Sequence, residues 1–379
     1  MPADLETLSY MASRLRHRGP DALGHWVDGS VGMAHTRLSI IDLQGSQQPM
    51  VSVDGRRHLV FNGEILNYRQ LRAGLSYPFA TDGDTEVLLA LYDKYGPAGV
   101  EEIRGQFAYA IHDADTGCTH LFRDRIGILP LYYVLDTRLF AFASEIKALL
   151  PLIDRPAVDE DSLHDYLAHR AVPSPHTLIK GVHKLQPGHH LVVSADGTHR
   201  LSAYWQLNPR PLRHRLTAST AVELVDEALK TSVRESLVAD VPVGVYLSGG
   251  VDSSLLTAMA SREHAGQVLH TFGASFGDPR HDESPGARKV ASSFGTIHHE
   301  VVISADDFLT NWADLSWSRD GPLSEPADVA IFRLAQLARE EVKVVLSGEG
   351  SDELFAGYPK HVFAVPTRWI GSLPSSRLL

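Results

Sequence analysis

The stretch Val241-Pro-Val-Gly-Val-Tyr-Leu247 runs directly into Ser248-Gly249-Gly250-Val251-Asp252-Ser253-Ser254, and this junction decides the fold of the second half of the chain. An apolar strand that enters a Gly/Ser turn before a helix leaves free backbone N–H groups at the positive end of the helix dipole. Adjacent glycines let the backbone approach a ligand closely, and Asp252 is placed to hold a divalent cation beside a polyphosphate. The loop contains no Lys, so it is not a Walker-type phosphate loop and suits the departing pyrophosphate of ATP better than a transferred γ-phosphate.

A second loop of the same kind, Ser347-Gly-Glu-Gly-Ser-Asp-Glu353, follows the apolar run 343–346. Helical and strand patterns alternate around both loops: we predict helices at 217–237, 254–264, 284–294 and 328–340, and strands at 241–247, 268–276, 298–303 and 343–346. Such alternation predicts an α/β doubly wound parallel sheet with both loops at its carboxyl edge. Either loop alone is also compatible with an ordinary turn that carries surface acids.

The first half of the chain has a different texture, with short strands and frequent turns. We predict strands at 31–35, 38–41, 58–61, 107–111, 120–123, 131–135 and 139–142, and helices at 5–16, 85–95 and 159–169. This mixture indicates an α+β domain in which helices pack on a layered antiparallel sheet. A polar, proline-interrupted boundary near 205–217 separates two domains, 1–205 and 216–379.

Composition and charge exclude several classes of protein. Of the 379 residues, 44% are hydrophobic and 21% charged, and the net charge of −11 argues against a nucleic-acid or anionic-membrane partner. We expect no membrane span and no signal peptide, and the single Cys118 excludes a disulfide framework and fits a cytoplasmic location. The 20 His show no metal-ligand spacing such as H-E-x-x-H.

Together these motifs resemble glutamine-dependent asparagine synthetases. The two loops are similar to the synthetase half, which belongs to the ATP-pyrophosphatase (PP-loop) group. The first half is similar to the class II glutaminase domain, an N-terminal nucleophile-type αββα sandwich. The matching stretches are Arg16-His-Arg-Gly-Pro-Asp21, His35-Thr-Arg-Leu-Ser-Ile40, Phe61-Asn-Gly-Glu64, Asp82-Gly-Asp-Thr-Glu86, Arg123-Asp-Arg-Ile-Gly127, Ala143-Ser-Glu-Ile-Lys-Ala-Leu149 and Leu185-Gln-Pro-Gly188.

The resemblance implies a glutamine pocket in the first half. Arg37 would hold the α-carboxylate of glutamine through its bidentate guanidinium, although alone it also fits a surface strand. Asn62 and Gly63 match an oxyanion hole, although Asn-Gly alone favours a type I′ hairpin turn. Glu64 and Asp84 match the acids that bind the α-amino group, although each alone fits a solvated turn.

The resemblance also implies an ATP site in the second half, with ATP and Mg²⁺ as cofactors and aspartate, glutamine and ATP as small-molecule partners. Glu349 matches an acid that guides ammonia onto the aspartyl-adenylate, and Asp252 and Asp352 match the Mg²⁺ ligands. The expected ATP-binding residues are Leu247, Ser248, Gly249, Gly250, Asp252, Ser253, Ser254, Gly273, Ser347 and Gly348. The implied activity is a carbon–nitrogen ligase that makes asparagine by adenylating aspartate, and a homodimer is compatible with it.

The chain departs from the family pattern at both ends. The family's glutaminase nucleophile is a Cys directly after the initiator Met, whereas this chain has Pro2 there, and Cys118 lies on the wrong element to replace it. The synthetase domain of the family also continues well past the second loop. We therefore expect truncation at both ends and no glutamine hydrolysis by the usual route. A natural short relative is the other explanation.

Two other functions remain open on this sequence. One is another adenylating ligase that forms an amide or a ring, similar to a β-lactam synthetase. The other is an inactive relative that binds nucleotide or glutamine without turnover.

Overall fold

The computed structural model describes residues 3–361 except 138, 209–215, 265, 279 and 281, so part of the expected domain boundary lies outside the described residues, as does the stretch 362–379. The chain divides into two compact units. The first comprises 1–225, 238–240 and 308–328, and the second comprises 226–237, 241–307 and 329–379. Within the described part, no helix is long and apolar enough to span a membrane.

The first unit is built on a six-stranded antiparallel sheet with the order β11-β10-β6-β5-β4-β3. Its strands are β3 (Met50–Val51), β4 (Arg57–Ile65), β5 (Gly105–Asp113), β6 (Cys118–Arg123), β10 (His189–Val193) and β11 (His199–Ala203). Two smaller antiparallel sheets face it. One pairs β1 (Ala22–Asp28) with β2 (Val31–Arg37), and the other has the order β8-β7-β9 from β7 (Tyr132–Leu135), β8 (Phe140–Ala143) and β9 (Val182–Lys184).

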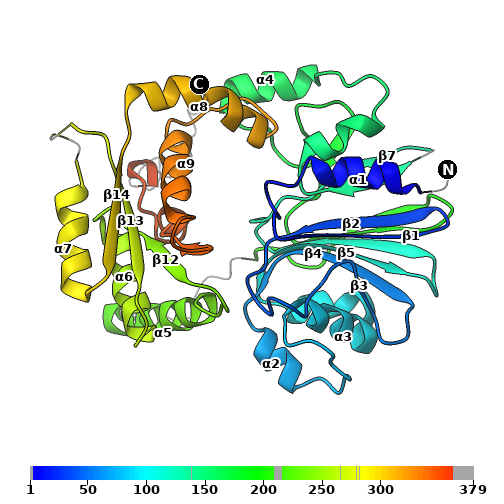
Figure 1. The fold of residues 1–379 in the computed structure, drawn as a ribbon, viewed down its shortest axis with the longest axis horizontal. Coiled ribbons are helices and arrows are strands. Elements are labelled where there is room, and N and C mark those ends of the chain that lie inside the picture. Colours follow the sequence, from blue (N-terminus) through cyan, green and yellow to red (C-terminus); the bar gives the residue numbers. More distant parts are fainter. Residues whose placement is uncertain are drawn as a thin grey trace, which may run out of the picture. The chain divides into compact units, whose positions relative to one another are not determined.

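Helices cover both outer faces of these sheets (Figure 1). Helix α1 (Leu5–Ser13) lies on the side of the small sheets, and α2 (Tyr68–Ala73) and α3 (Thr85–Tyr95) lie on the side of the six-stranded sheet. The unit also contains the short helices η1 (Gly96–Glu102), η2 (Ile146–Ala148) and η3 (Leu150–Leu152) and helix α4 (Glu160–His169). The result is the predicted αββα sandwich.

Successive side chains along β4 and β5 point alternately into two apolar layers, one on each face of the sheet. Leu59, Phe61 and Tyr109 face the buried side of α3, whereas Val60 and Ala108 face the small sheets with Met33. The middle of β4 and most of β5 are therefore buried on both faces, which explains the apolar runs at 59–61 and 107–111.

The strand predicted at 38–41 is wrong, because this segment lies outside every sheet. Side chains take up its backbone groups instead. The Ser39 N–H donates to the Asp21 carboxylate at 2.9 Å, and the Ile41 carbonyl accepts from the Arg37 guanidinium at 3.3 Å. Because these backbone groups are hydrogen-bonded to side chains, the segment does not have to pair with a strand.

The second unit has a four-stranded, fully parallel sheet with the order β14-β13-β12-β15. Its strands are β12 (Val243–Tyr246), β13 (His270–Ser275), β14 (Ile297–Val302) and β15 (Val344–Leu346). Its helices are α5 (Ala218–Ser236), α6 (Val251–Glu263), α7 (Ser284–Phe294), α9 (Ala327–Ala338) and α10 (Ser351–Phe355).

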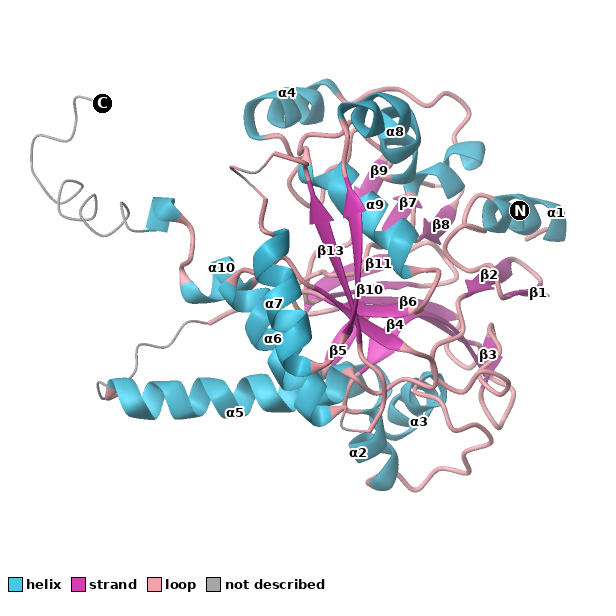
Figure 2. Ribbon diagram, turned by 60° about the vertical axis from the view of Figure 1, so that its left-hand side comes forward, coloured by secondary structure: helices cyan, strands magenta, loops and turns pink. Residues whose placement is uncertain are grey.

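Both faces of this sheet are covered by helices (Figure 2). Val245 packs with α5 and α6, and Leu247 packs with α7, whereas Phe272 packs with α9 on the opposite face. The predicted α/β doubly wound sheet is confirmed. The sequence did not predict α8 (Ala305–Ser318), most of which belongs to the first unit.

A buried ion cluster joins distant segments of the first unit around Lys147, whose side chain is 1% exposed. Its Nζ contacts the Glu145 carboxylate and lies 2.9 Å from Oδ1 of Asp320. Glu145 also accepts from Arg18 at 3.0 Å, which ties the chain after α1 to the same cluster. Burial makes this cluster sensitive to the loss of one partner, since the remaining charges stay desolvated.

Replacing Lys147 with Met should therefore lower the free energy of unfolding by about 3–5 kcal/mol, because the buried Asp320 loses its cation and Glu145 keeps only its contacts from the side of Arg18. Urea unfolding followed by tryptophan fluorescence measures this change. The matched control is Lys180→Met, which removes an exposed ammonium group of the same unit. An equal effect of the two substitutions would contradict a buried role for Lys147.

Candidate active site

The two Gly/Ser loops meet at the carboxyl edge of the parallel sheet. Strands β12 and β15 are direct neighbours, so the loops that follow them leave the same edge side by side. A β-carbon built on Gly348 would lie 3.3 Å from Cβ of Asp252, which places the second loop in contact with the first. Strand order also reverses between β12 and β15, and such a reversal is where doubly wound sheets bind their ligands.

The first loop presses its backbone against the start of α7. Gly249 has φ +90°, and a β-carbon there would lie 2.7 Å from the backbone nitrogen of Ala287. The loop is also braced internally: the Ser253 hydroxyl lies 3.0 Å from that of Ser248 and accepts from the Ser248 N–H at 3.2 Å. These contacts brace the shape of the turn.

Helix α6 begins at Val251, within the stretch 248–254 and three residues earlier than predicted, so Asp252, Ser253 and Ser254 all lie in its first turn. Gly250 is its N-cap residue, and no side chain caps the helix there. The first backbone N–H groups therefore have no side-chain cap and stand at the positive end of the dipole, next to the exposed Asp252.

The remaining predicted ATP-binding residues border the same edge. The Leu247 N–H donates to the Phe272 carbonyl at 2.8 Å, and a β-carbon on the next residue, Gly273, would lie 3.1 Å from the Leu247 carbonyl oxygen. In the second loop, Ser347 and Glu349 are exposed, and Asp352 lies in the first turn of α10. The structure thus brings both loops and Gly273 to one edge of the sheet.

A separate pocket lies in the first unit, where a cavity of about 1260 Å³ opens between the facing sheets. Apolar side chains such as Met33 and Phe142 line part of it. All five residues predicted to bind glutamine also line it: Arg37, Asn62, Gly63, Glu64 and Asp84.

Asn62 and Gly63 lie inside β4 and are paired with β5, so the hairpin-turn alternative is wrong. Gly63 has φ +143°, and a β-carbon there would lie 2.1 Å from the Gln106 carbonyl oxygen, so the position requires glycine. The Asn62 side-chain nitrogen Nδ2 is buried and makes no hydrogen bond with any described residue. A buried, unpaired amide donor is suited to an oxygen that a ligand brings.

Arg37 is 5% exposed, so the surface-strand alternative is wrong for this residue. Its guanidinium donates to the carbonyls of Leu43 at 3.1 Å and Asp42 at 2.7 Å, in addition to that of Ile41. These bonds fix the 41–43 loop at the cavity and leave the guanidinium as its cationic wall.

The half-buried Glu64 and the buried Asp84 form an acidic pair beside this cation. Burial and the neighbouring Asp84 charge raise the pKa of Glu64 to about 7. Burial likewise raises the pKa of Asp84 to about 6, although its carboxylate accepts from the Ile65 N–H at 3.0 Å. The pair is therefore suited to a cationic group, which would favour its ionised form.

The sequence did not indicate how Asn62 is positioned. Gln48 spans the backbone of the preceding Phe61: its Oε1 accepts from the Phe61 N–H at 2.6 Å and its Nε2 donates to the Phe61 carbonyl at 3.1 Å. His35 also contacts that carbonyl through Nε2 at 3.0 Å, and burial lowers its pKa to about 4. No spacing in the sequence connects Gln48 or His35 with Phe61, so only the tertiary structure identifies them.

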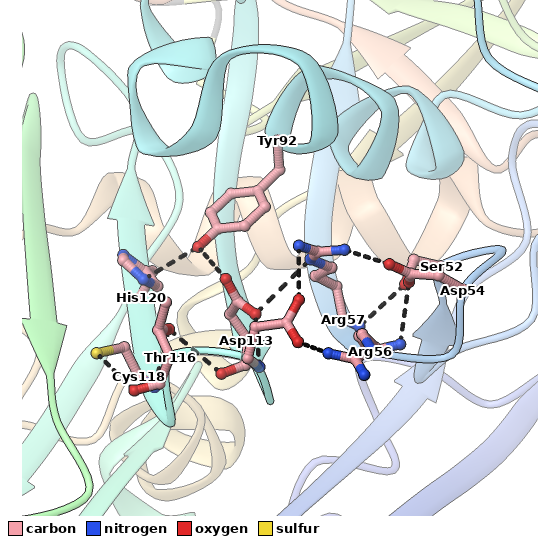
Figure 3. Close-up of polar contacts among 10 residues, drawn as sticks. Ser52, Asp54, Arg56, Arg57, Tyr92, Asp113, Thr116, Cys118 and His120 are labelled. Carbon is pink, nitrogen blue, oxygen red and sulfur yellow. Dashed lines mark hydrogen bonds and ion pairs between the residues drawn. The ribbon is translucent and has the colours of Figure 1, made fainter.

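Cys118 lies far along the same sheet from Asn62, although its neighbours Gly117 and Thr119 line the cavity. It pairs with Asp113 on β5, whereas Asn62 pairs with Ala108, so about 17 Å of strand separates the two positions. Figure 3 shows Cys118 beside Thr116, in a polar cluster where Tyr92 contacts Asp113 and His120. The single thiol of the sequence is therefore not placed to attack a ligand held at Asn62.

Comparisons with known proteins identify the family of the chain. Residues 2–205 match the family described as "Glutamine amidotransferase domain", and residues 224–377 match the family described as "Asparagine synthase". The chain belongs to the glutamine-hydrolysing asparagine synthetase family. The recognition drawn from its motifs is confirmed.

Three relatives illustrate the family likeness. The chain is 36% identical to asparagine synthetase [glutamine-hydrolyzing] 1 of Bacillus subtilis over 93% of its length and 56% of that protein. It is 39% identical to a putative asparagine synthetase [glutamine-hydrolyzing] of Mycobacterium bovis over 94% of its length and 57% of that protein. A putative asparagine synthetase [glutamine-hydrolyzing] 2 of Methanocaldococcus jannaschii is 33% identical, with 97% and 76% covered. The chain spans little more than half the length of the first two relatives.

The raised pKa of Glu64 predicts how stability depends on pH. Since the folded pKa is about 7 against an ordinary 4.5, the folded state binds more protons than the unfolded state between these values. The free energy of unfolding should therefore fall as the pH rises across this window. Glu64→Gln should flatten this dependence and gain on the order of 3 kcal/mol at its upper end.

Urea unfolding at a series of pH values from about 5 to 8 measures this difference. Glu102→Gln, which removes an exposed carboxylate from the same unit, is the control and should leave the profile unchanged. A Glu64→Gln profile parallel to that of the unchanged chain would contradict the predicted burial of the Glu64 charge.

Proposed function

We propose that this chain adenylates aspartate with ATP and forms asparagine from the adenylate and ammonia, as an asparagine synthetase. The observation that carries the proposal is the contact between the two Gly/Ser loops, with Gly348 against Asp252, at the reversal of strand order. Membership of the family and the synthetase match over 224–377 support it.

The first step joins the aspartate β-carboxylate to the α-phosphorus of ATP. A carboxylate oxygen attacks that phosphorus, the bond to the pyrophosphate oxygen breaks, and pyrophosphate leaves. We propose that Ser248, Gly249, Gly250, Ser253 and Ser254 hold the pyrophosphate, because the open N-terminus of α6 offers backbone N–H groups and a favourable dipole. Leu247, Gly273, Ser347 and Gly348 would border the adenosine.

The residues at this edge fit a Mg²⁺ ion, since Asp252 and Asp352 supply the carboxylate oxygens that this ion prefers. Gly348 packs against Asp252, so the second loop approaches the first ligand closely. Bound Mg²⁺ would neutralise phosphate charge as pyrophosphate departs. Asp252 and Asp352 would hold the ion, and the backbone N–H groups of the first loop would bind the pyrophosphate.

The second step forms the amide bond. Ammonia attacks the activated carbonyl carbon, AMP leaves with the electron pair of the broken bond, and a proton leaves the new amide nitrogen. We assign Glu349 to guide ammonia and receive this proton, because it is an exposed carboxylate in the second loop.

The pocket in the first unit is proposed to bind glutamine. Arg37 would face the α-carboxylate, Glu64 and Asp84 the α-amino group, and Asn62 with Gly63 the amide oxygen. The unpaired Nδ2 of Asn62 and the raised pKa values of both acids support this orientation. Hydrolysis also needs a nucleophile at the amide carbon, which Cys118 does not supply.

We propose residues 1–205 as the glutamine domain and 216–379 as part of the synthetase domain, which the family matches support. The single Cys supports a cytoplasmic location. The proposal of a homodimer is based on the family resemblance. The proposal that nucleic acid is not a partner is based on the net charge of −11.

Exchange of labelled pyrophosphate into ATP tests the proposal directly, since it reports adenylation without a nitrogen donor. We expect exchange that requires both Mg²⁺ and aspartate, and a loss of about a hundredfold in Asp252→Asn, because the phosphates lose their orienting carboxylate. Asp314→Asn, an exposed acid on α8, is the control. Equal exchange in both variants would contradict the assignment, and exchange with another carboxylate instead of aspartate would indicate a different adenylating ligase.

The close approach of the first loop to α7 provides a second test. Gly249→Ala should weaken exchange strongly, because its β-carbon would displace the loop from Ala287. Gly266→Ala is a matched control: its φ of +92° imposes the same backbone strain as the +90° of Gly249, but no atom lies within 4 Å of its β-carbon. If both variants lose exchange equally, backbone strain and not loop position explains the loss.

A further inference from the structure

Three potential metal ligands meet on the sheet of the second unit, away from the two loops. His270 is the first residue of β13, His299 lies on β14, and Glu341 lies in the turn between α9 and β15. One nitrogen or oxygen from each residue lies within 4.8 Å of the other two. Among the described residues, no other group of three His, Cys, Asp or Glu side chains meets this spacing.

The register of the strands aligns the two imidazoles. His299 pairs with Phe272, two residues beyond His270, so both rings project from the same face of the sheet. The rings stack with centroids 5.2 Å apart and an interplanar angle of 10°. Nδ1 of His270 lies 3.0 Å from Nε2 of His299. Two nitrogens bound to one tetrahedral zinc ion lie about 3.3 Å apart, so this pair needs to open only slightly.

The surroundings hold these side chains in place. Phe272 is fully buried and stacks on the His299 ring at 5.0 Å. Glu341 is exposed, but its N–H donates to the Ala338 carbonyl at 3.0 Å, and the following Val342 packs on Phe272. The ligand from the turn is therefore anchored beside the core that supports both rings.

The neighbouring His298 side chain already has other polar partners. His298 lies between Thr271, at 2.9 Å from its Oγ1, and Glu300, at 3.2 Å. By contrast, the side chains of His270 and His299 are hydrogen-bonded to each other within the described part of the chain. A metal ion can replace the proton shared by this pair.

We propose that His270, His299 and Glu341 bind one transition-metal ion of the zinc class. Two imidazoles and one carboxylate suit Zn²⁺ or Co²⁺ with an open position for water, whereas Mg²⁺ prefers oxygen ligands alone. His270 begins its strand, so the site lies towards the amino edge of the sheet, opposite the loops at the carboxyl edge. The ion would tie the turn before β15 to β13 and β14, and it is distinct from the Mg²⁺ proposed for catalysis.

The test uses the full chain, freed of metal with a chelator and then dialysed against Zn²⁺ or Co²⁺ in excess Mg²⁺. We expect one tight site per chain, a visible Co²⁺ absorption band, and a melting temperature that rises with Zn²⁺. His270→Ala and His299→Ala should each weaken metal binding by more than about tenfold. Even the loss of a residue that only hydrogen-bonds to a metal ligand lowers metal affinity by about tenfold or more.

Two further variants make the outcome decisive. Glu341→Gln changes only an exposed turn, so it should weaken binding while far-UV circular dichroism without metal stays unchanged. His164→Ala removes an exposed imidazole on α4 and should bind as the unchanged chain does. Equal zinc affinity in the unchanged chain, His270→Ala and Glu341→Gln would overturn the proposal.

Discussion

The parallel pairing of β12 with both β13 and β15 is the constraint on which the synthetase-like half depends. A central strand with parallel partners on both sides must send its chain out at the same edge as they do. The loops after β12 and β15 therefore meet, and glycines at the meeting points allow the backbone contact. Without this pairing, each loop would be an isolated helix N-terminus with a nearby acid.

The pocket proposed to bind glutamine depends on the opposite kind of pairing. Antiparallel β4 and β5 lie close enough at Gly63 to exclude any side chain, and this approach sets Asn62 at the cavity with its amide unpaired. The Gln48 side chain forms two hydrogen bonds with the backbone of Phe61, the residue before Asn62. In the same cavity Asp84 is buried and Glu64 half-buried, and their charges are only partly compensated, which is costly unless a cation completes the site.

The parallel sheet also gives its two edges different chemistry. Its carboxyl edge presents backbone N–H groups, hydroxyls and carboxylates, which favour phosphate and a hard cation. Its amino edge carries a stacked pair of imidazoles, which favour a softer cation. The proposed Mg²⁺ and the proposed zinc-class ion would therefore lie at opposite edges of one sheet.

The sequence alone determined the family, both fold classes and nearly all the candidate residues, because glycine turns after apolar strands are local signals. It was wrong at 38–41, where side chains from distant segments satisfy a backbone that looks like a strand. Only the tertiary structure decided that Asn62-Gly63 lies within a strand, that Gln48 supports it, and that Cys118 lies too far along the sheet to serve it. The same holds for His270, His299 and Glu341, whose wide spacing in the chain conceals the match. Strand register, which sequence patterns specify poorly, makes such residues neighbours.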